Sequence, residues 1–253
     1  MNTNTVSTIA EHARAAQKAY ENMPDIFRKY FHLRPTSKDI TVVSTLPYAP
    51  MRGLNVSPED LPKRLSAIKK KLPVLLSMTD QSCSELQALG FSKREKQSAL
   101  EENIQAMFIR GMLDGEDYYQ GIRFVASELT LGDHKRFDVV GFQGDTLYIF
   151  ELKRNRDTTA APQVKTYCDY VVNHCDKFKE VLGDYPNLSV PHFKSVKGIA
   201  VMCYSENTIY PTWNDWYKAA EKVKRSEKYT PDISGIDIWL FKEALTFIKL
   251  SSE

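Results

Sequence analysis

The segment between residues 122 and 153 constrains the fold more than any other part of the chain. Two turn signals, Gly132-Asp133 and Gly144-Asp145, divide it into three stretches rich in β-branched and aromatic residues. These stretches lie at 122–131, 136–142 and 147–153. The spacing predicts a meander of three antiparallel strands.

The last of these strands is apolar on both faces, from Leu147 to Phe150, as expected of a strand buried in a sheet. A helix is predicted over 160–182, where apolar residues recur at helical spacing. The apolar run at 196–204 then predicts a strand parallel to the third one, reached through a helical crossover. Two further strands are expected at 236–241 and 245–250. We therefore predict an α/β (α+β) fold with a mixed central sheet flanked by helices.

The first 90 residues are predicted to form a mostly helical region of unknown role, followed by a domain at 91–253. The expected elements are one or two helices in 1–34, a short strand at 39–46, a connection at 47–58, a helix from near Ser57 to Pro73, a helix from Ser92 to about Met112, and a Trp/Lys-rich helix at 213–228. The basic cluster between Lys63 and Lys71 is a candidate contact to a nucleic-acid backbone, although such charge runs are usually solvated faces.

Charged side chains stand at the end of the buried third strand. Because side chains alternate along a strand, Glu151 and Lys153 point to the same face. Asp138 lies in the preceding strand, where it can approach Glu151 across the pair. Carboxylate oxygens bind Mg²⁺, and Mn²⁺ is expected to substitute for it. A bound metal ion activates water and neutralises phosphate charge, so the set suits phosphodiester hydrolysis.

These residues resemble the pattern of the PD-(D/E)XK nuclease superfamily, with Asp138 followed by Glu151-Leu152-Lys153. Further matches, typical of the Mrr-like and mismatch-nuclease-like branches, are Gln163 and Tyr167 in a Gln-x-x-x-Tyr helix, and Glu101 or Glu102 in an upstream helix. The resemblance covers about residues 92–205. One departure is Phe137, where the superfamily often has proline.

The resemblance implies a restriction-endonuclease-like core and Mg²⁺-dependent hydrolysis of DNA, leaving 5′-phosphate and 3′-hydroxyl ends. It also implies DNA as the partner and a homodimer as a candidate assembly. Asp138, Glu151 and Glu101 are then the candidate metal ligands. Glu101 is favoured over Glu102 because it is nearer the apolar helix face that must meet the sheet.

The remaining candidate site residues support this centre. The resemblance places Lys153, Gln163 and Tyr167 with the catalytic group, although Tyr167 also belongs to an apolar stripe that core packing alone would explain. Arg154, Arg156 and Lys165 are candidate contacts to nucleic acid, and a solvated loop explains the two arginines equally well.

Two alternatives stay open. The first is a catalytically silent protein with the nuclease fold that binds nucleic acid or a protein partner in a regulatory or defence-related role. The second is a structural α/β domain with a fortuitous motif, which predicts that Asp138 and Glu151 lie far apart.

Composition excludes several other classes of function. The net charge of +2 gives no global attraction to nucleic acid, so a binding surface must be local. The four cysteines show no spacing for a zinc site, and neither a phosphate-binding GxxxxGK[ST] loop nor a GxSxG elbow occurs. No nucleotide cofactor is therefore expected. Without a signal peptide pattern or an apolar run of about 20 residues, we expect a cytoplasmic protein with no membrane association.

Overall fold

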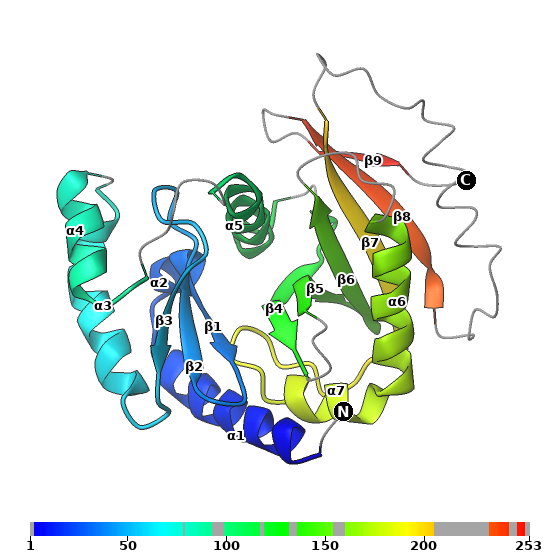
Figure 1. The fold of residues 1–253 in the computed structure, drawn as a ribbon, viewed down its shortest axis with the longest axis horizontal. Coiled ribbons are helices and arrows are strands. Elements are labelled where there is room, and N and C mark those ends of the chain that lie inside the picture. The colour runs from blue at the N-terminus through cyan, green and yellow to red at the C-terminus, as the bar shows by residue number, and fades with distance from the viewer. Residues whose placement is uncertain are drawn as a thin grey trace.

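The computed structural model describes residues 3–77, 79–92, 99–116, 119–131, 136–153, 160–204, 233–242 and 247–250. Within them the chain forms a mixed α and β structure with a larger and a smaller sheet (Figure 1). The expected helix at 213–228 lies outside the described residues. None of the described helices combines the length and the apolar character needed to cross a bilayer.

The larger sheet is mixed, as predicted. Its strands are β4 (Arg123–Thr130), β5 (Arg136–Gln143), β6 (Thr146–Lys153), β7 (Ser195–Tyr204), β8 (Ile233–Lys242) and β9 (Phe247–Leu250), which are neighbours in that order. The first three strands form the predicted antiparallel meander. The β6–β7 pair is parallel, as is β7–β8, while β9 runs antiparallel to β8. The crossover from β6 to β7 confirms the prediction for the central part of the sheet.

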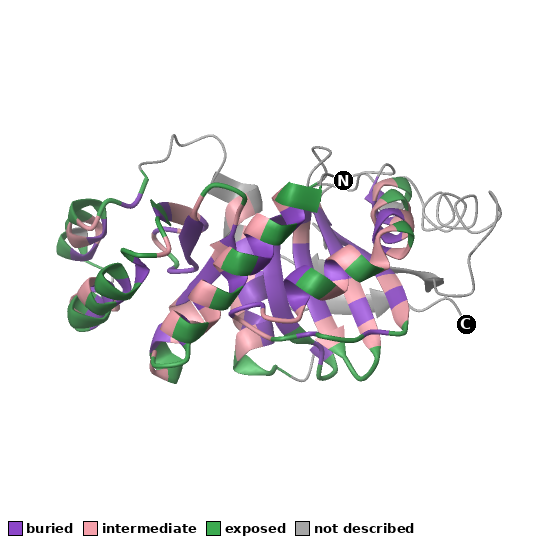
Figure 2. Cartoon of the chain, turned by 90° about the horizontal axis from the view of Figure 1, so that it is seen from below, coloured by how far each residue is buried: buried purple, intermediate pink, exposed green. Residues whose placement is uncertain are grey.

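Helices cover both faces of this sheet, which explains why β6 is apolar on both sides. On one face, α6 (Ala160–Asn173) and α7 (Cys175–Leu182) pack on buried residues such as Leu147 and Ile149. On the other face, α5 (Ala99–Asp114) packs on residues such as Val139 and Phe150. Because side chains alternate along a strand, the sheet contributes residues to two separate hydrophobic cores, one on each face. Figure 2 shows the buried strands behind helices that alternate between buried and exposed positions.

The predicted helix over 160–182 is interrupted at His174, which separates α6 from α7. The backbone N–H of His174 bonds to the carbonyl of Val171, three residues back, at 3.2 Å. The carbonyl of Tyr170 instead lies 2.9 Å from Nδ1 of His174. A side-chain nitrogen thus takes the place of the backbone donor, and the helix axis can change direction at this residue.

The first 90 residues contain a sheet that the prediction of a mostly helical region left out. Helices α1 (Thr3–Tyr20), α2 (Asp25–Tyr30), α3 (Leu61–Leu75) and α4 (Asp80–Ala88) surround strands β1 (Phe31–Pro35), β2 (Ile40–Ser44) and β3 (Arg52–Val56). The strands form an antiparallel sheet in the order β1-β2-β3. Only β2 was predicted as a strand. The prediction of a connection at 47–58 is wrong, because β3 lies within it. The helical segment expected in 1–34 ends at Tyr30, because β1 begins at Phe31.

Pro73 does not end its helix, contrary to the prediction, because α3 continues to Leu75. Proline inside a helix removes one hydrogen bond and costs about 3 kcal/mol or more. Leu72, just before Pro73, and Leu75, two residues after it, are buried, whereas the proline itself is exposed. Burial of a leucine contributes roughly 1.5–3 kcal/mol, so these two residues offset the loss.

Three consecutive residues of β1 tie the smaller sheet to the edge strand β4. His32 Nε2 lies 2.5 Å from Ser127 Oγ, and Arg34 forms an ion pair with Glu128. Between them, the backbone of Leu33 bonds to the side chain of Asn187, which also donates to the carbonyl of Val125 on β4. The N-terminal helix α1 adds Val6, Ile9 and Ala10 to the same core as α6 and α7. Polar contacts and a shared core therefore connect the first 90 residues to the larger sheet.

Replacing Asn187 with alanine is expected to lower the free energy of unfolding by about 2–3 kcal/mol. The amide accepts from Leu33 N at 3.1 Å and donates to Leu33 O at 3.0 Å and Val125 O at 2.9 Å. Alanine leaves these partly buried backbone groups without a partner, at about 1–3 kcal/mol for each unsatisfied group, moderated by relaxation and water. Urea unfolding measures the effect, with exposed Asn173→Ala as control. Equal stability of the two variants would contradict the bridging role.

Candidate active site

The meander brings Asp138 to the strand that carries Glu151. The paired register of β5 and β6 reaches Val139 and Phe150, and one further residue on each strand places Asp138 opposite Glu151. The Asp138 carboxylate accepts a hydrogen bond from the backbone N–H of Leu152 at 2.9 Å. Asp138 is therefore held against the Glu-Leu-Lys sequence. This contact contradicts the expectation of a fortuitous motif, in which the two carboxylates lie far apart.

Glu151 is a buried carboxylate, with only 2% of its surface exposed. An ionised carboxylate away from water is costly unless it is paired with a cation or a metal ion. Lys153 supplies one such partner, because its Nζ donates to Glu151 Oε1 at 2.6 Å. The predicted common orientation of Glu151 and Lys153 is thus present as a direct ion pair.

The helix α6 contributes Gln163 and Tyr167, one turn apart. Gln163 Nε2 donates to the Tyr167 hydroxyl at 2.8 Å, and the Tyr167 ring packs edge-on against Phe137 with 4.8 Å between ring centroids. Tyr167 therefore bonds to the other predicted residue of α6 and also packs in the core. Phe137, the residue before Asp138, serves as a packing surface for α6.

The electrostatics of Tyr167 show which charges surround its hydroxyl. Burial is the largest cause that raises the pKa of Tyr167, and the hydrogen bond from Gln163 opposes it. The negative charges of Glu151 and Asp138 raise this pKa further, while the positive charge of Lys153 lowers it. The pKa of Tyr167 thus depends on all three charged residues of the strand pair, and because it is raised, the phenol stays protonated at neutral pH.

Four other predicted site residues are not among those that the described contacts bring to this centre. Lys165 lies on α6, but its ammonium is paired with Asp169 at 2.8 Å. Glu101 belongs to α5, and its side chain lies outside the described part of the structure. Arg154 and Arg156 also lie outside the described residues. The structure therefore brings together Asp138, Glu151, Lys153, Gln163 and Tyr167.

Gln105 is a neighbour of this site that the sequence pattern did not indicate. Its Nε2 donates to the backbone carbonyl of Asp138 at 2.7 Å, and the side chain is buried. It links α5 directly to the strand residue that carries a candidate metal ligand. Its place in the sequence offered one signal, because Gln105 is a polar residue four positions after Glu101 and so lies on the same side of α5.

The chemistry of this set fits a hard divalent cation. In the part of the chain that the structure describes, no three His, Cys, Asp or Glu side chains group around a common point. Mg²⁺ does not need such a cage, since it is commonly held by one or two carboxylates together with waters and substrate phosphate. Asp138 and Glu151 supply two carboxylates, the hard oxygen ligands that Mg²⁺ prefers, and Lys153 forms an ion pair with one of them.

Comparisons of the chain with models of protein families, with curated protein sequences and with solved structures found no match. The family resemblance therefore stays a prediction.

Proposed function

We propose that the protein is a metal-dependent nuclease that hydrolyses DNA phosphodiester bonds at the β5–β6 site. One observation carries the proposal: Asp138 is bonded to the backbone of Leu152, between Glu151 and Lys153, at the end of a strand buried on both faces. A buried ion pair contributes little net stability, and charged groups held away from water cluster at functional sites.

Asp138 and Glu151 would hold Mg²⁺ or Mn²⁺ through their carboxylate oxygens. When bound there, the metal ion would lower the pKa of a bound water and neutralise charge on the scissile phosphate. Glu151 is already fixed by its bond to Lys153, and Asp138 by its bond to Leu152 N. Both carboxylates are thus oriented before the cation binds, which reduces the entropy lost on binding.

Lys153 would interact with the phosphate once metal binding has weakened the ion pair between Lys153 and Glu151. The Lys153 side chain is 21% exposed and that of Glu151 only 2%, so the lysine is the more accessible member of the pair. A positive charge at this position stabilises negative charge that develops on the phosphate oxygens in the transition state. The same ammonium can orient the attacking water.

Tyr167 and Gln163 would position the substrate. The Tyr167 oxygen accepts from Gln163, which leaves the phenol proton to be donated elsewhere. With its pKa raised by burial and by the neighbouring carboxylates, the phenol keeps that proton at neutral pH. It can then donate to a phosphate oxygen or to a water in the site.

The test is a cleavage assay with purified full-length protein and Mg²⁺ or Mn²⁺. Substrates are linear, circular, single-stranded, branched and mismatched DNA, together with RNA. We expect cleavage of DNA that EDTA abolishes, and Mn²⁺ is expected to raise the melting temperature of the protein. Mn²⁺-dependent stabilisation without cleavage would support a silent nuclease fold instead. If the protein shows neither cleavage of any substrate nor a rise in melting temperature with Mn²⁺, the proposed metal site itself is wrong.

A further inference from the structure

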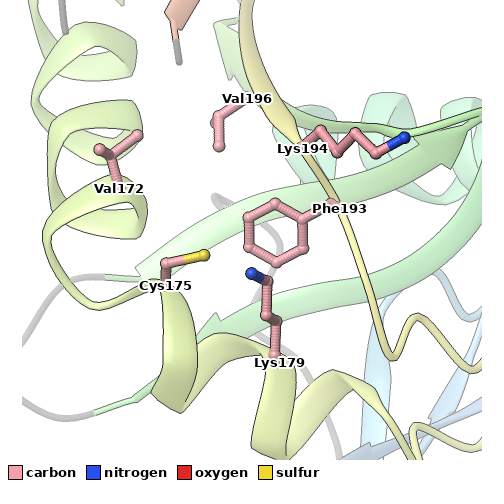
Figure 3. Close-up of a pocket in the computed structure, with 6 residues that line it drawn as sticks. All are labelled: Val172, Cys175, Lys179, Phe193, Lys194 and Val196. Atoms are coloured by element: carbon pink, nitrogen blue, oxygen red, sulfur yellow. The ribbon is translucent and has the colours of Figure 1, made fainter. Parts of the chain in front are cut away.

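A cavity of about 320 Å³ lies away from the proposed active site, between α6, α7 and the start of β7. Its lining residues are Val172, Cys175, Lys179, Phe193, Lys194 and Val196 (Figure 3). Val196 stands six residues before Met202, the β7 partner of Lys153. At about 3.3 Å per residue, the cavity is roughly 20 Å along the strand from Lys153. It is therefore separate from the β5–β6 site.

The floor of the cavity is apolar and partly aromatic. Phe193 and Val196 are buried, and Val172 on α6 is half-buried. The volume is at the lower end of the roughly 300–1,000 Å³ typical of small-molecule sites. An apolar wall of this size suits a ligand with a flat ring, which gains from contact with the Phe193 ring beyond the area it buries.

Two lysines give the cavity a positive rim. Lys194 is mostly exposed and already paired with Asp145 at 2.7 Å. The Lys179 ammonium lies 5.3 Å from the centroid of the Phe193 ring, and no carboxylate of the described residues forms an ion pair with it. A contact between an ammonium and an aromatic face contributes only about 0.5–1 kcal/mol at an exposed site. Lys179 is thus the cation that a carboxylate entering the cavity would attract.

We propose that this cavity binds small aromatic carboxylates. The ring of the ligand lies against Phe193, Val172 and Val196, and its carboxylate accepts hydrogen bonds from the Lys179 ammonium. Charge-assisted hydrogen bonds are roughly twice as strong as neutral ones, so the anion matters as well as the ring. Figure 3 shows the Cys175 sulfur pointing toward the Phe193 ring from the same wall as Lys179. Cys175 is a free thiol, and a bound ligand will shield it.

The test uses full-length protein and the probe 2-naphthoate, with the neutral 2-naphthamide as its matched analogue. Binding is followed by ligand-observed NMR. The rate of Cys175 alkylation is followed by mass spectrometry of the peptide that contains Cys175. We expect saturable binding of naphthoate, at least tenfold weaker binding of naphthamide, and at least threefold slower alkylation of Cys175 at saturation.

Two variants locate the binding site. Lys179→Gln should weaken naphthoate binding at least tenfold but leave naphthamide unchanged, and Val172→Trp should abolish both by filling the cavity. Exposed Lys70→Gln on α3 is the control and should bind like the wild type. Circular dichroism confirms that each variant is folded. Absence of saturable binding, or equal binding by wild type, Lys179→Gln and Val172→Trp, would overturn the proposal. Neither result depends on nuclease activity.

Discussion

Glu151→Gln is expected to reduce the rate of DNA cleavage by about 10³-fold while the protein stays folded. The substitution keeps the size of the side chain and an oxygen that can accept from Lys153, but it removes the negative charge. A charge held in a buried site acts on its ligand far more strongly than an exposed one. Loss of one essential charged group from a preorganised catalytic set typically costs two to four orders of magnitude.

The measurement is single-turnover cleavage with saturating enzyme, so that chemistry is not hidden by product release. Exposed Glu180→Gln on α7 is the matched control, because it makes the same chemical change outside the site. Near-wild-type cleavage by Glu151→Gln would contradict the assignment of Glu151 as a metal ligand. Cleavage that is lost in Glu180→Gln as well would point to a general effect of removing acidic residues.

Lys153→Met distinguishes the role of the cation from that of the carboxylate. Both variants should cleave poorly, but only Glu151→Gln should lose the rise in melting temperature that Mn²⁺ gives the wild type. In Lys153→Met, Glu151 has lost the ammonium that competes with a metal ion, so Mn²⁺ should stabilise this variant at least as much as the wild type. The two cleavage-deficient variants should thus differ in their stabilisation by Mn²⁺. If both residues had only a structural role, no such difference would be expected.

The central sheet could be predicted from sequence because its signals are local. Gly144-Asp145 forms the turn between β5 and β6, Gly132-Asp133 is a turn signal that lies outside the described residues, and apolar residues on both faces of β6 mark a strand covered by helices. The shared orientation of Glu151 and Lys153 follows from alternation along one strand. Features that depend on residues close together in the sequence could therefore be predicted.

The N-terminal sheet could not be predicted in the same way. Strand β1 follows a helix without a break and ends in Pro35, while β3 contains Gly53 and follows Met51, which has a positive φ of 51°. Proline and glycine argue against strands locally, and pairing with β2 overrides that preference. Tertiary context decides these segments.

Contacts between residues far apart in the sequence could not be predicted either. Asn187 lies 154 residues from Leu33, and Gln105 lies 33 residues from Asp138. A polar residue carries no sequence signal for a partner so far away. These contacts hold the site and the smaller sheet in place, and only a three-dimensional structure reveals them.

Acid is expected to destabilise the protein through His32, by about 2 kcal/mol between pH 7.5 and pH 5. The imidazole is fully buried, and burial, assisted by the positive charge of Arg34, lowers the pKa of His32 to about 3. In the unfolded chain a histidine has a pKa near 6.5. The unfolded state therefore binds a proton that the folded state excludes, so stability is retained above pH 6.5 and is lost as the pH falls toward 3.

The geometry of His32 explains why the folded state excludes this proton. Nε2 lies 2.5 Å from Ser127 Oγ, whereas Nδ1 is buried without a hydrogen-bond partner among the described residues. An imidazolium has two N–H donors, so one would be left unsatisfied beside the cationic Arg34. His32→Gln removes the titrating group and keeps a side chain that can bond to Ser127.

Urea unfolding at pH 7.5 and pH 5 measures the effect. His32→Gln should lose about 2 kcal/mol less stability than the wild type on going from the higher to the lower pH, whatever its stability at pH 7.5. Exposed His192→Gln should keep the pH dependence of the wild type. If wild type and His32→Gln change equally with pH, His32 must be able to take up its proton in the folded state. The β1–β4 junction would then open to water before the protein unfolds.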